Sequence, residues 1–260
     1  MAFSTHPAAR PLRFPSGLAS IILFGVVWAG LSLFLDDPGL LPGPAEVAQV
    51  FWHEFQSGEV LFHLTATLSR VAGAFVLAMC IGSAIGILAG MNPGFNAWAD
   101  PWIIILLNLP ALVVIVLCYI WIGLTEAAAV TAVALNKIPM ITVMLREGAR
   151  SLSPALDDMA ATFRMPRIRY WRHVIAPQLA PHFAASARAG LALIWKIVLV
   201  VEFLGRSNGI GFQIHLHFQM FEVAEILAYA FSFIAVMLVI EYLVMQPMEK
   251  AASRWRRHEG

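Results

Sequence analysis

Charge is scarce in this sequence: only 13% of its 260 residues are Asp, Glu, Lys or Arg, while 60% are hydrophobic. A soluble globular domain has about 25% charged residues, so the composition excludes an ordinary soluble protein. Cysteine is scarce too. Cys80 and Cys118 lie in apolar runs without ligand spacing, so we expect two buried thiols, no disulfide framework and no metal site.

Sequence motifs for catalysis are also missing. The chain has no GxxxxGK[ST] run, so it cannot itself be a nucleotide-hydrolysing subunit. It has no HExxH spacing, and the carboxylates inside its apolar runs are isolated. We therefore expect no catalytic residue and no nucleic-acid partner, and an intramembrane enzyme is a disfavoured alternative.

Long apolar runs dominate what is present. About 20 apolar residues cross a bilayer, and a helix satisfies its own backbone hydrogen bonds there. The first run ends in LFLDDPG without a small-residue cleavage site, so we interpret it as an uncleaved span. The sequence predicts an all-α polytopic membrane protein with six transmembrane helices, at residues 17–35, 68–90, 101–122, 125–145, 185–204 and 225–246.

Lys and Arg are distributed unequally between the two sides of these spans. With the N-terminus inside, the outer segments 36–67, 123–124 and 205–224 contain Arg206 as their one basic residue. The positive-inside rule then predicts that the N-terminal tail 1–16 and the basic tail 247–260 both lie in the cytoplasm. The predicted inner basic residues are Arg10, Arg13, Arg146, Arg150, Arg164, Arg167, Arg169, Arg172, Lys250, Arg254, Arg256 and Arg257.

Small residues recur at every fourth position of the second predicted span: Ala74, Ala78, Gly82, Gly86 and Gly90. Residues of this size let two helix backbones approach closely, so the stripe predicts helix packing. A substrate path along the same face is the alternative.

Two predicted spans contain proline. Pro110, which follows Asn108, should kink the third span because proline frees a backbone carbonyl. Pro139 should do the same in the fourth, beside Lys137. Broken helices often line a translocation path, so Asn108 and Pro110 are candidate pathway residues, with ordinary packing kinks as the alternative.

Ionisable residues within the predicted spans include Arg70, Lys137, Lys196 and Glu202. Charges at this depth are costly and usually face a cavity or a partner charge. Lys137, Lys196 and Glu202 are candidate pathway residues, and the two lysines would attract an anion. The alternatives are structural: Lys137 snorkels or caps freed carbonyls, and Lys196 pairs with a neighbouring helix.

Residues 147–183 form a polar, basic island between the fourth and fifth predicted spans. Apolar residues at helical spacing predict a first surface helix, and Pro166 can start a second that carries Ile168 and Trp171. We expect Pro177 and Pro181 to end the segment. A helix pair of this kind suits docking of a soluble partner, and an interfacial helix on anionic lipid is the alternative.

The spacing from Asp158 to Pro177 resembles the EAA-x3-G-x9-I-x-LP signature of ABC-importer permeases. Asp158 stands in the Glu position, Ala160 is retained, Arg164 replaces the Gly, and Pro177 supplies the final proline. The whole chain is similar to the nitrate/sulfonate/taurine branch of these permeases, most clearly in LLPGPAEV (40–47), NLPALVVIVLCYIWIGL (108–124) and VVEFLGRSNGIGFQI (200–214).

This resemblance implies a type I ABC-importer permease fold in the bacterial inner membrane. Two permease subunits, expected to be identical, would form the pore above an ATPase dimer, and a periplasmic binding protein would deliver the solute. ATP would bind the ATPase, so the permease itself has no expected cofactor. The expected solute is a small anion such as nitrate, a sulfonate or taurine. A pyrimidine or flavin precursor or an aromatic acid is the alternative, and an ATP-independent transporter is less favoured.

The resemblance also assigns the island as the coupling helix that contacts the ATPase. The implied contacts run from Asp158 through Ala160 to Arg164, and Ile168 and Trp171 anchor the second half. Arg164 departs from the signature, and because arginine favours helix more than glycine does, we expect the helix to continue to Pro166.

Overall fold

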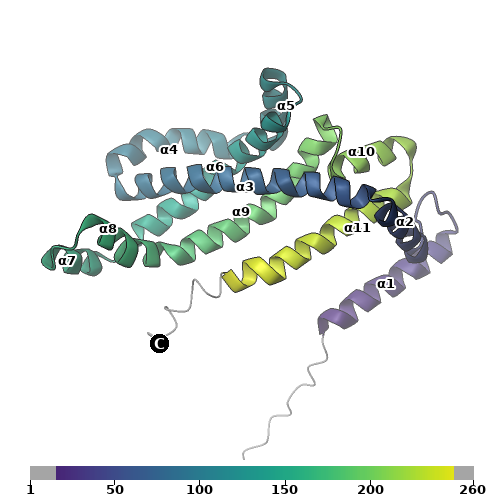
Figure 1. Cartoon of the computed structure of the whole chain (residues 1–260), viewed down its shortest axis with the longest axis horizontal. Helices are drawn as coiled ribbons and strands as arrows, with labels where there is room; N and C mark the ends of the chain where they lie inside the picture. The colour runs from purple at the N-terminus through teal and green to yellow at the C-terminus, as the bar shows by residue number, and fades with distance from the viewer. Residues whose placement is uncertain (1–15, 249–260) are drawn as a thin grey trace, which may run out of the picture.

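The computed structural model describes residues 16–248, and within that range the chain is helical without a β-strand (Figure 1). The predicted N-terminal tail and the basic tail from residue 249 onward lie outside the described residues. The α-helices are α1 (Ser16–Leu35), α2 (Pro44–Ser57), α3 (Glu59–Met91), α4 (Pro93–Asn108), α5 (Ala111–Ile122), α6 (Glu126–Arg150), α7 (Pro154–Thr162), α8 (Arg167–Tyr170), α9 (Ala176–Gly205), α10 (Ile210–Met220) and α11 (Val223–Ile240). Two short π-helices, η1 (Trp171–Ile175) and η2 (Glu241–Met245), continue α8 and α11.

The centre of the molecule is the pair α3 and α6, with α9 packed against α6 (Figure 1). Their close approach depends on the small-residue stripe of α3. A Cβ atom on Gly86 would lie 2.5 Å from the carbonyl oxygen of Thr142, and one on Gly90 would lie 2.5 Å from the Cβ of Ala149. The structure therefore places the stripe against α6, where a larger side chain would separate the two backbones.

Within residues 16–248, three helices are long and apolar enough to cross a membrane: α3, α6, and α11 together with η2. α4 with α5 forms a fourth, bent crossing segment. The remaining predicted spans correspond to α1, whose apolar part is shorter, and α9. In α9 the predicted span contains Arg188, Lys196 and Glu202, which lowers its apolar character.

The third predicted span is broken and not merely kinked. α4 ends at Asn108, α5 begins at Ala111, and the two helices meet at 97°. Leu109 and Pro110 both have extended backbone conformations, and the Asn108 side chain donates to the carbonyl of Ile104 (2.8 Å). Proline disfavours α-conformation in the residue before it, which explains why the break falls at Leu109. By contrast, α6 continues through Pro139.

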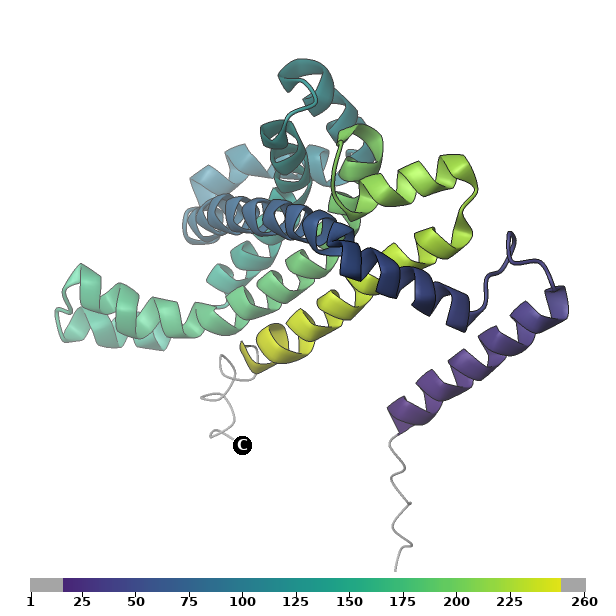
Figure 2. The same ribbon diagram turned by 45° about the vertical axis from the view of Figure 1, so that its right-hand side comes forward.

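Two helices occupy segments that the sequence analysis left as outer loops. α2 lies between the first two predicted spans, and α10 lies between the last two. Figure 2 shows α1 diverging from the rest of the bundle, which it contacts through α2 and through Trp28, whose ring lies 5.4 Å from that of Phe231 in α11. Cys118 is buried as expected, whereas Cys80 is exposed, so the prediction of two buried thiols is wrong for Cys80.

The prediction that Pro177 and Pro181 end the basic island is also wrong. α9 starts at Ala176 and runs through both prolines, and it continues α8 and η1 without a break. In the π-helix just before Pro177, backbone hydrogen bonds join residues five apart instead of four. This change in the hydrogen-bond pattern accommodates a proline, which lacks an N–H. Pro177 itself is exposed.

Candidate functional site

The basic island folds into a hairpin, here called the basic hairpin, that comprises residues 154–175. Its two arms are joined by the Tyr170 hydroxyl, which donates to Asp157 Oδ1 (2.8 Å). The backbone N–H of Ser153 donates to Gln178 Oε1 (2.9 Å) and fixes the hairpin to the start of α9. The hairpin is thus attached rigidly to the long helix α9.

The turn of the basic hairpin ends α7 earlier than the sequence analysis expected. α7 stops at Thr162, and Arg164 has a left-handed backbone with φ of 45°. Arg164 N–H donates to the carbonyl of Ala161 (3.0 Å), and Met165 N–H donates to that of Ala160 (2.9 Å). This bond pair is the Schellman motif, whose left-handed position is usually glycine. The expectation that Arg164 would continue the helix to Pro166 is therefore wrong, because Arg164 adopts the glycine conformation.

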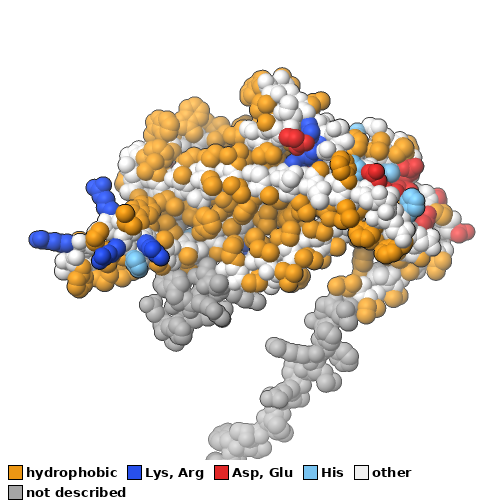
Figure 3. Space-filling model, viewed as in Figure 1, with side chains coloured by type: hydrophobic (Ala, Val, Ile, Leu, Met, Phe, Trp, Pro, Cys, Tyr) orange, Lys and Arg blue, Asp and Glu red, His pale blue; other side chains and the backbone are white. Residues whose placement is uncertain are grey.

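The surface of the basic hairpin combines exposed apolar side chains with arginines. Ile168 is 83% exposed, Phe163 74% and Trp171 45%. Asp158 and Arg164 are exposed as well, whereas Ala160 is buried and supports the hairpin from inside. Figure 3 shows Lys and Arg side chains gathered at this end, and Asp, Glu and His side chains gathered at the opposite end.

At the opposite end lies a group of interacting polar residues that we call the outer charge network: Arg70, Glu126, Glu202, Arg206 and Asn208. Arg70 donates to both carboxylate oxygens of Glu126 (2.7 and 2.7 Å), to Glu202 Oε1 (2.6 Å) and to the Asn208 carbonyl (2.9 Å). Arg206 completes the network with an ion pair to Glu126. Arg70 is 3% exposed and Glu202 is fully buried, so each charge depends on the other for compensation.

Glu202 also accepts a hydrogen bond from the first turn of α10. Its Oε2 accepts from the N–H of Gly211 (2.9 Å), and Thr67 Oγ1 accepts from the N–H of Ile210 (2.8 Å). A carboxylate is favoured there because the N-terminus of a helix carries free N–H groups and partial positive charge. Gly209 has φ of 111°, and a Cβ on it would collide with the Glu202 carboxylate. The glycines therefore allow the loop before α10 to close over Glu202.

The structure separates the predicted pathway residues. Glu202 is buried within the outer charge network, and Asn108 and Pro110 lie at the break between α4 and α5. Lys196 is exposed on α9, and Lys137 is half-buried on α6. Gly190 of α9 packs against Ile141 of α6, which places the two lysines at similar depths in this antiparallel helix pair.

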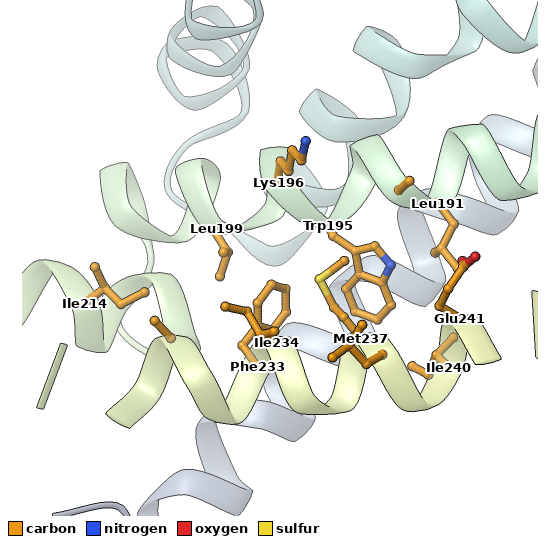
Figure 4. Close-up of a pocket in the computed structure, with 13 residues that line it drawn as sticks. Leu191, Trp195, Lys196, Leu199, Ile214, Phe233, Ile234, Met237, Ile240 and Glu241 are labelled. Atoms are coloured by element: carbon orange, nitrogen blue, oxygen red, sulfur yellow. The ribbon is translucent and has the colours of Figure 1, made fainter. Parts of the chain in front are cut away.

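A cavity of about 520 Å³ lies beside Lys196, between α9 and α11; we call it the α9–α11 groove (Figure 4). Trp195 forms its wall together with Phe233, the two rings being 5.5 Å apart and nearly perpendicular. Arg188 and Glu241 form an ion pair (2.6 Å) across the two helices, and Glu241 lines the groove. The groove is otherwise lined by aliphatic side chains such as Leu199.

His217, Glu222 and Glu225, at the junction of α10 and α11, have metal-ligand chemistry and lie close together. Their ligand atoms lie within 4.8 Å of one another, and His217 Nδ1 is already 2.7 Å from Glu222 Oε2. His215 and His217 are both on helical α10, so their spacing of two does not place them on one face. His215 Nε2 instead lies 2.8 Å from the Gln219 amide nitrogen.

Comparison with known proteins matches residues 82–257 to the family described as "Binding-protein-dependent transport system inner membrane component". The chain is 27% identical over 261 residues to the putative aliphatic sulfonates transport permease protein SsuC of Bacillus subtilis (strain 168), with 100% of this chain and 94% of that protein covered. It is 23% identical over 254 residues to the taurine transport system permease protein TauC of Escherichia coli (strain K12), covering 96% and 92%. It is 27% identical over 212 residues to the bicarbonate transport system permease protein CmpB of Synechococcus elongatus, covering 81% and 70%.

Among solved structures, an inward-facing conformation of the MetNI methionine ABC transporter has a chain similar to this one, with a TM-score of 0.59. The similarity covers 75% of this chain and 94% of that chain at 14% sequence identity. It shows a shared fold.

Proposed function

The chain belongs to the family of inner membrane components of binding-protein-dependent transport systems, and from this membership we propose how its parts contribute to transport. Members of the family are non-enzymatic permease subunits of ABC importers. The protein is accordingly a multi-pass protein of the bacterial inner membrane that works with a separate ATPase and a solute-binding protein.

The proposed solute is a small anion. Relatives named for sulfonate, taurine and bicarbonate transport support this proposal, and so does the position of Lys196. An exposed ammonium midway along an apolar helix is too costly to leave against lipid tails. The observation that carries the proposal is therefore the exposed Lys196, which calls for water, a solute or a partner subunit beside it.

We propose that two identical copies enclose the pathway, with the face of α9 that carries Lys196 turned away from lipid. Each copy would cross the membrane six times, through α1, α3, the α4–α5 pair, α6, α9 and α11. Both chain ends would then lie in the cytoplasm. The segregation of basic and acidic side chains to opposite ends supports this orientation (Figure 3). The acidic end would face the binding protein.

The basic hairpin is the proposed docking surface for the ATPase. Ile168 and Trp171 are apolar side chains exposed at the basic end of the molecule, and Asp158 and Arg164 flank them with charge. Apolar anchors of this kind, when buried at an interface, contribute most of its binding energy. Lys137, Asn108 and Pro110 remain candidate pathway residues in this proposal.

The test is co-purification of the ATPase with the permease, together with ATP-driven solute uptake in proteoliposomes. Ile168→Asp should abolish both, because it places an uncompensated charge in the interface. Phe221→Asp is the matched control for ATPase co-purification: Phe221 is 82% exposed, close to Ile168 at 83%, but it lies at the opposite end of the molecule. Retention of ATPase binding and uptake by Ile168→Asp would show that the hairpin is not the docking surface.

A further inference from the structure

The α9–α11 groove has the size and lining of a site for an organic molecule. Its cavity of about 520 Å³ falls within the range of roughly 300–1,000 Å³ typical of small-molecule sites. A four-atom inorganic oxyanion fills on the order of 120 Å³, taking ~30 Å³ per water-sized atom. The lining is almost entirely carbon, so it could not replace the hydration of such an ion.

Lys196 supplies a positive charge at the rim of this groove. Figure 4 shows its ammonium pointing away from the apolar side chains, so a bound head group would lie at the rim and not among them. Lys196 is nine residues before the end of α9 at Gly205, about 13 Å along the helix at ~1.5 Å per residue. That distance is close to half of a hydrocarbon core of about 30 Å, too deep for the head group of a surrounding lipid.

The groove also contains a polar group without a partner. Trp195 is 3% exposed, yet its indole N–H has no hydrogen bond to any residue within the range 16–248 that the structure describes. Figure 4 shows the indole nitrogen directed toward the end of the groove where Glu241 lies. The indole N–H is not one of the fully buried unpaired polar atoms, and since Trp195 lines the groove this donor is available to a bound molecule.

We propose that the α9–α11 groove binds the transported solute as an organic anion, with its sulfonate or carboxylate head at Lys196 and its apolar body against Trp195 and Leu199. The inference rests on the proposed function and narrows it, because it excludes a bare inorganic oxyanion as the preferred solute. The flexible lysine stem allows the ammonium to turn toward a head group at the rim.

The test uses a cysteine in the groove of the assembled transporter in membrane vesicles. Ala192→Cys places a thiol on the exposed face of α9 between Arg188 and Lys196, in a background where Cys80 and Cys118 are replaced by alanine. Labelling rates are measured with an anionic and a cationic methanethiosulfonate. Lys196→Gln should lower the anionic-to-cationic rate ratio roughly tenfold, the lower end of the effect of charge in a cleft. Arg150→Gln, the control, removes an exposed positive charge of α6 outside the groove and should leave the ratio unchanged.

Protection experiments then identify the chemical class. Butanesulfonate should slow labelling of the Ala192→Cys protein, and nitrate at the same concentration should not. Equal protection by nitrate, or no protection by either anion, would overturn the proposal. An unreactive thiol that forms a disulfide between two copies would also overturn it, because a second subunit would then fill the groove. ATP-dependent uptake is measured in the same vesicles, so a failure of the transport function is detected separately from a failure of this site.

Discussion

The pairing of Arg70 with Glu202 leads to a prediction about stability. The two charges come from α3 and α9, 132 residues apart, and both are buried. Replacing Arg70 by Met leaves the Glu202 carboxylate buried without its cation. Removal of one partner from a buried ion pair typically costs about 3–5 kcal/mol, so we expect Arg70→Met to lower the free energy of unfolding by that amount.

The size of the effect depends on what remains around each charge. Glu202→Gln leaves Arg70 bonded to both oxygens of Glu126, so the expected cost is only about 1.5–3 kcal/mol, that of a charged hydrogen bond. In the double variant Arg70→Met/Glu202→Gln no charge is left buried. The double variant should therefore be more stable than Arg70→Met alone, by about 1–3 kcal/mol.

The measurement is equilibrium unfolding of the purified permease in mixed detergent micelles, followed by far-UV circular dichroism. Ser69→Ala is the control, because Ser69 is exposed on the same helix and its hydroxyl donates to the carbonyl of Ala66 in its own turn. It should change stability by less than about 0.5 kcal/mol. A loss below about 1 kcal/mol for Arg70→Met, or simple additivity in the double variant, would refute the reasoning that each charge compensates the other.

Three further predictions concern backbone conformation, helix packing and pH. Arg164→Gly should raise the free energy of unfolding by about 1 kcal/mol, because φ of 45° is strained for an L-residue; an unchanged or lower value would contradict the Schellman turn. Gly86→Ala should cost about 1–3 kcal/mol, because its Cβ would lie 2.5 Å from a carbonyl oxygen of α6. Gly73→Ala is its control on the same helix, where the nearest atom is 3.5 Å away, and should change stability by less than about 1 kcal/mol. The hydrogen bond from Tyr170 to Asp157 raises the pKa of the phenol, so its stabilising contribution should be full below pH ~10 and disappear as the pH rises through the higher folded pKa; Tyr170→Phe should remove this alkaline decline from the dependence of Tm on pH.

Local sequence patterns predicted those parts of the fold that depend on local chemistry. Apolar runs identified most of the long helices, and helical spacing identified both arms of the basic hairpin. α2 was missed because Gly43, Pro44 and Gly58 border it, and α10 was missed because it follows Gly209; Gly and Pro favour turns when the surroundings are unknown. The left-handed turn at Arg164 was missed because intrinsic propensity favours helix for arginine, whereas the hydrogen bonds of the finished turn decide otherwise.

For the candidate sites, too, local sequence patterns do not predict which residues far apart in the chain come into contact. The sequence identified Arg70 and Glu202 as costly intramembrane charges, but nothing local indicates that they meet, since the contact depends on how α3 packs beside α9. The glycines at the start of α10 were a usable signal in the sequence. Gly209 and Gly211 leave no room for a Cβ above Glu202, and such spacing near an intramembrane carboxylate suggests a backbone closing over it. Lys196 is exposed whereas Glu202 is buried, and this difference becomes known only from the packed structure.

One continuous helix, which begins at Arg167, connects the basic hairpin, the α9–α11 groove and the outer charge network. It runs through η1 and α9 to Gly205, about 57 Å at ~1.5 Å per residue, and carries Trp171, Lys196 and Glu202 in turn. At its outer end the network around Glu202 joins this helix to α3, and along its length the helix packs against α6. If a force at the hairpin shifts α9, we expect the width of the α9–α11 groove beside Lys196 to change. Loosening the outer connection by Arg70→Met should consequently reduce ATP-driven uptake even when ATPase binding and membrane insertion are intact, and unchanged uptake would show that transport does not depend on the outer charge network.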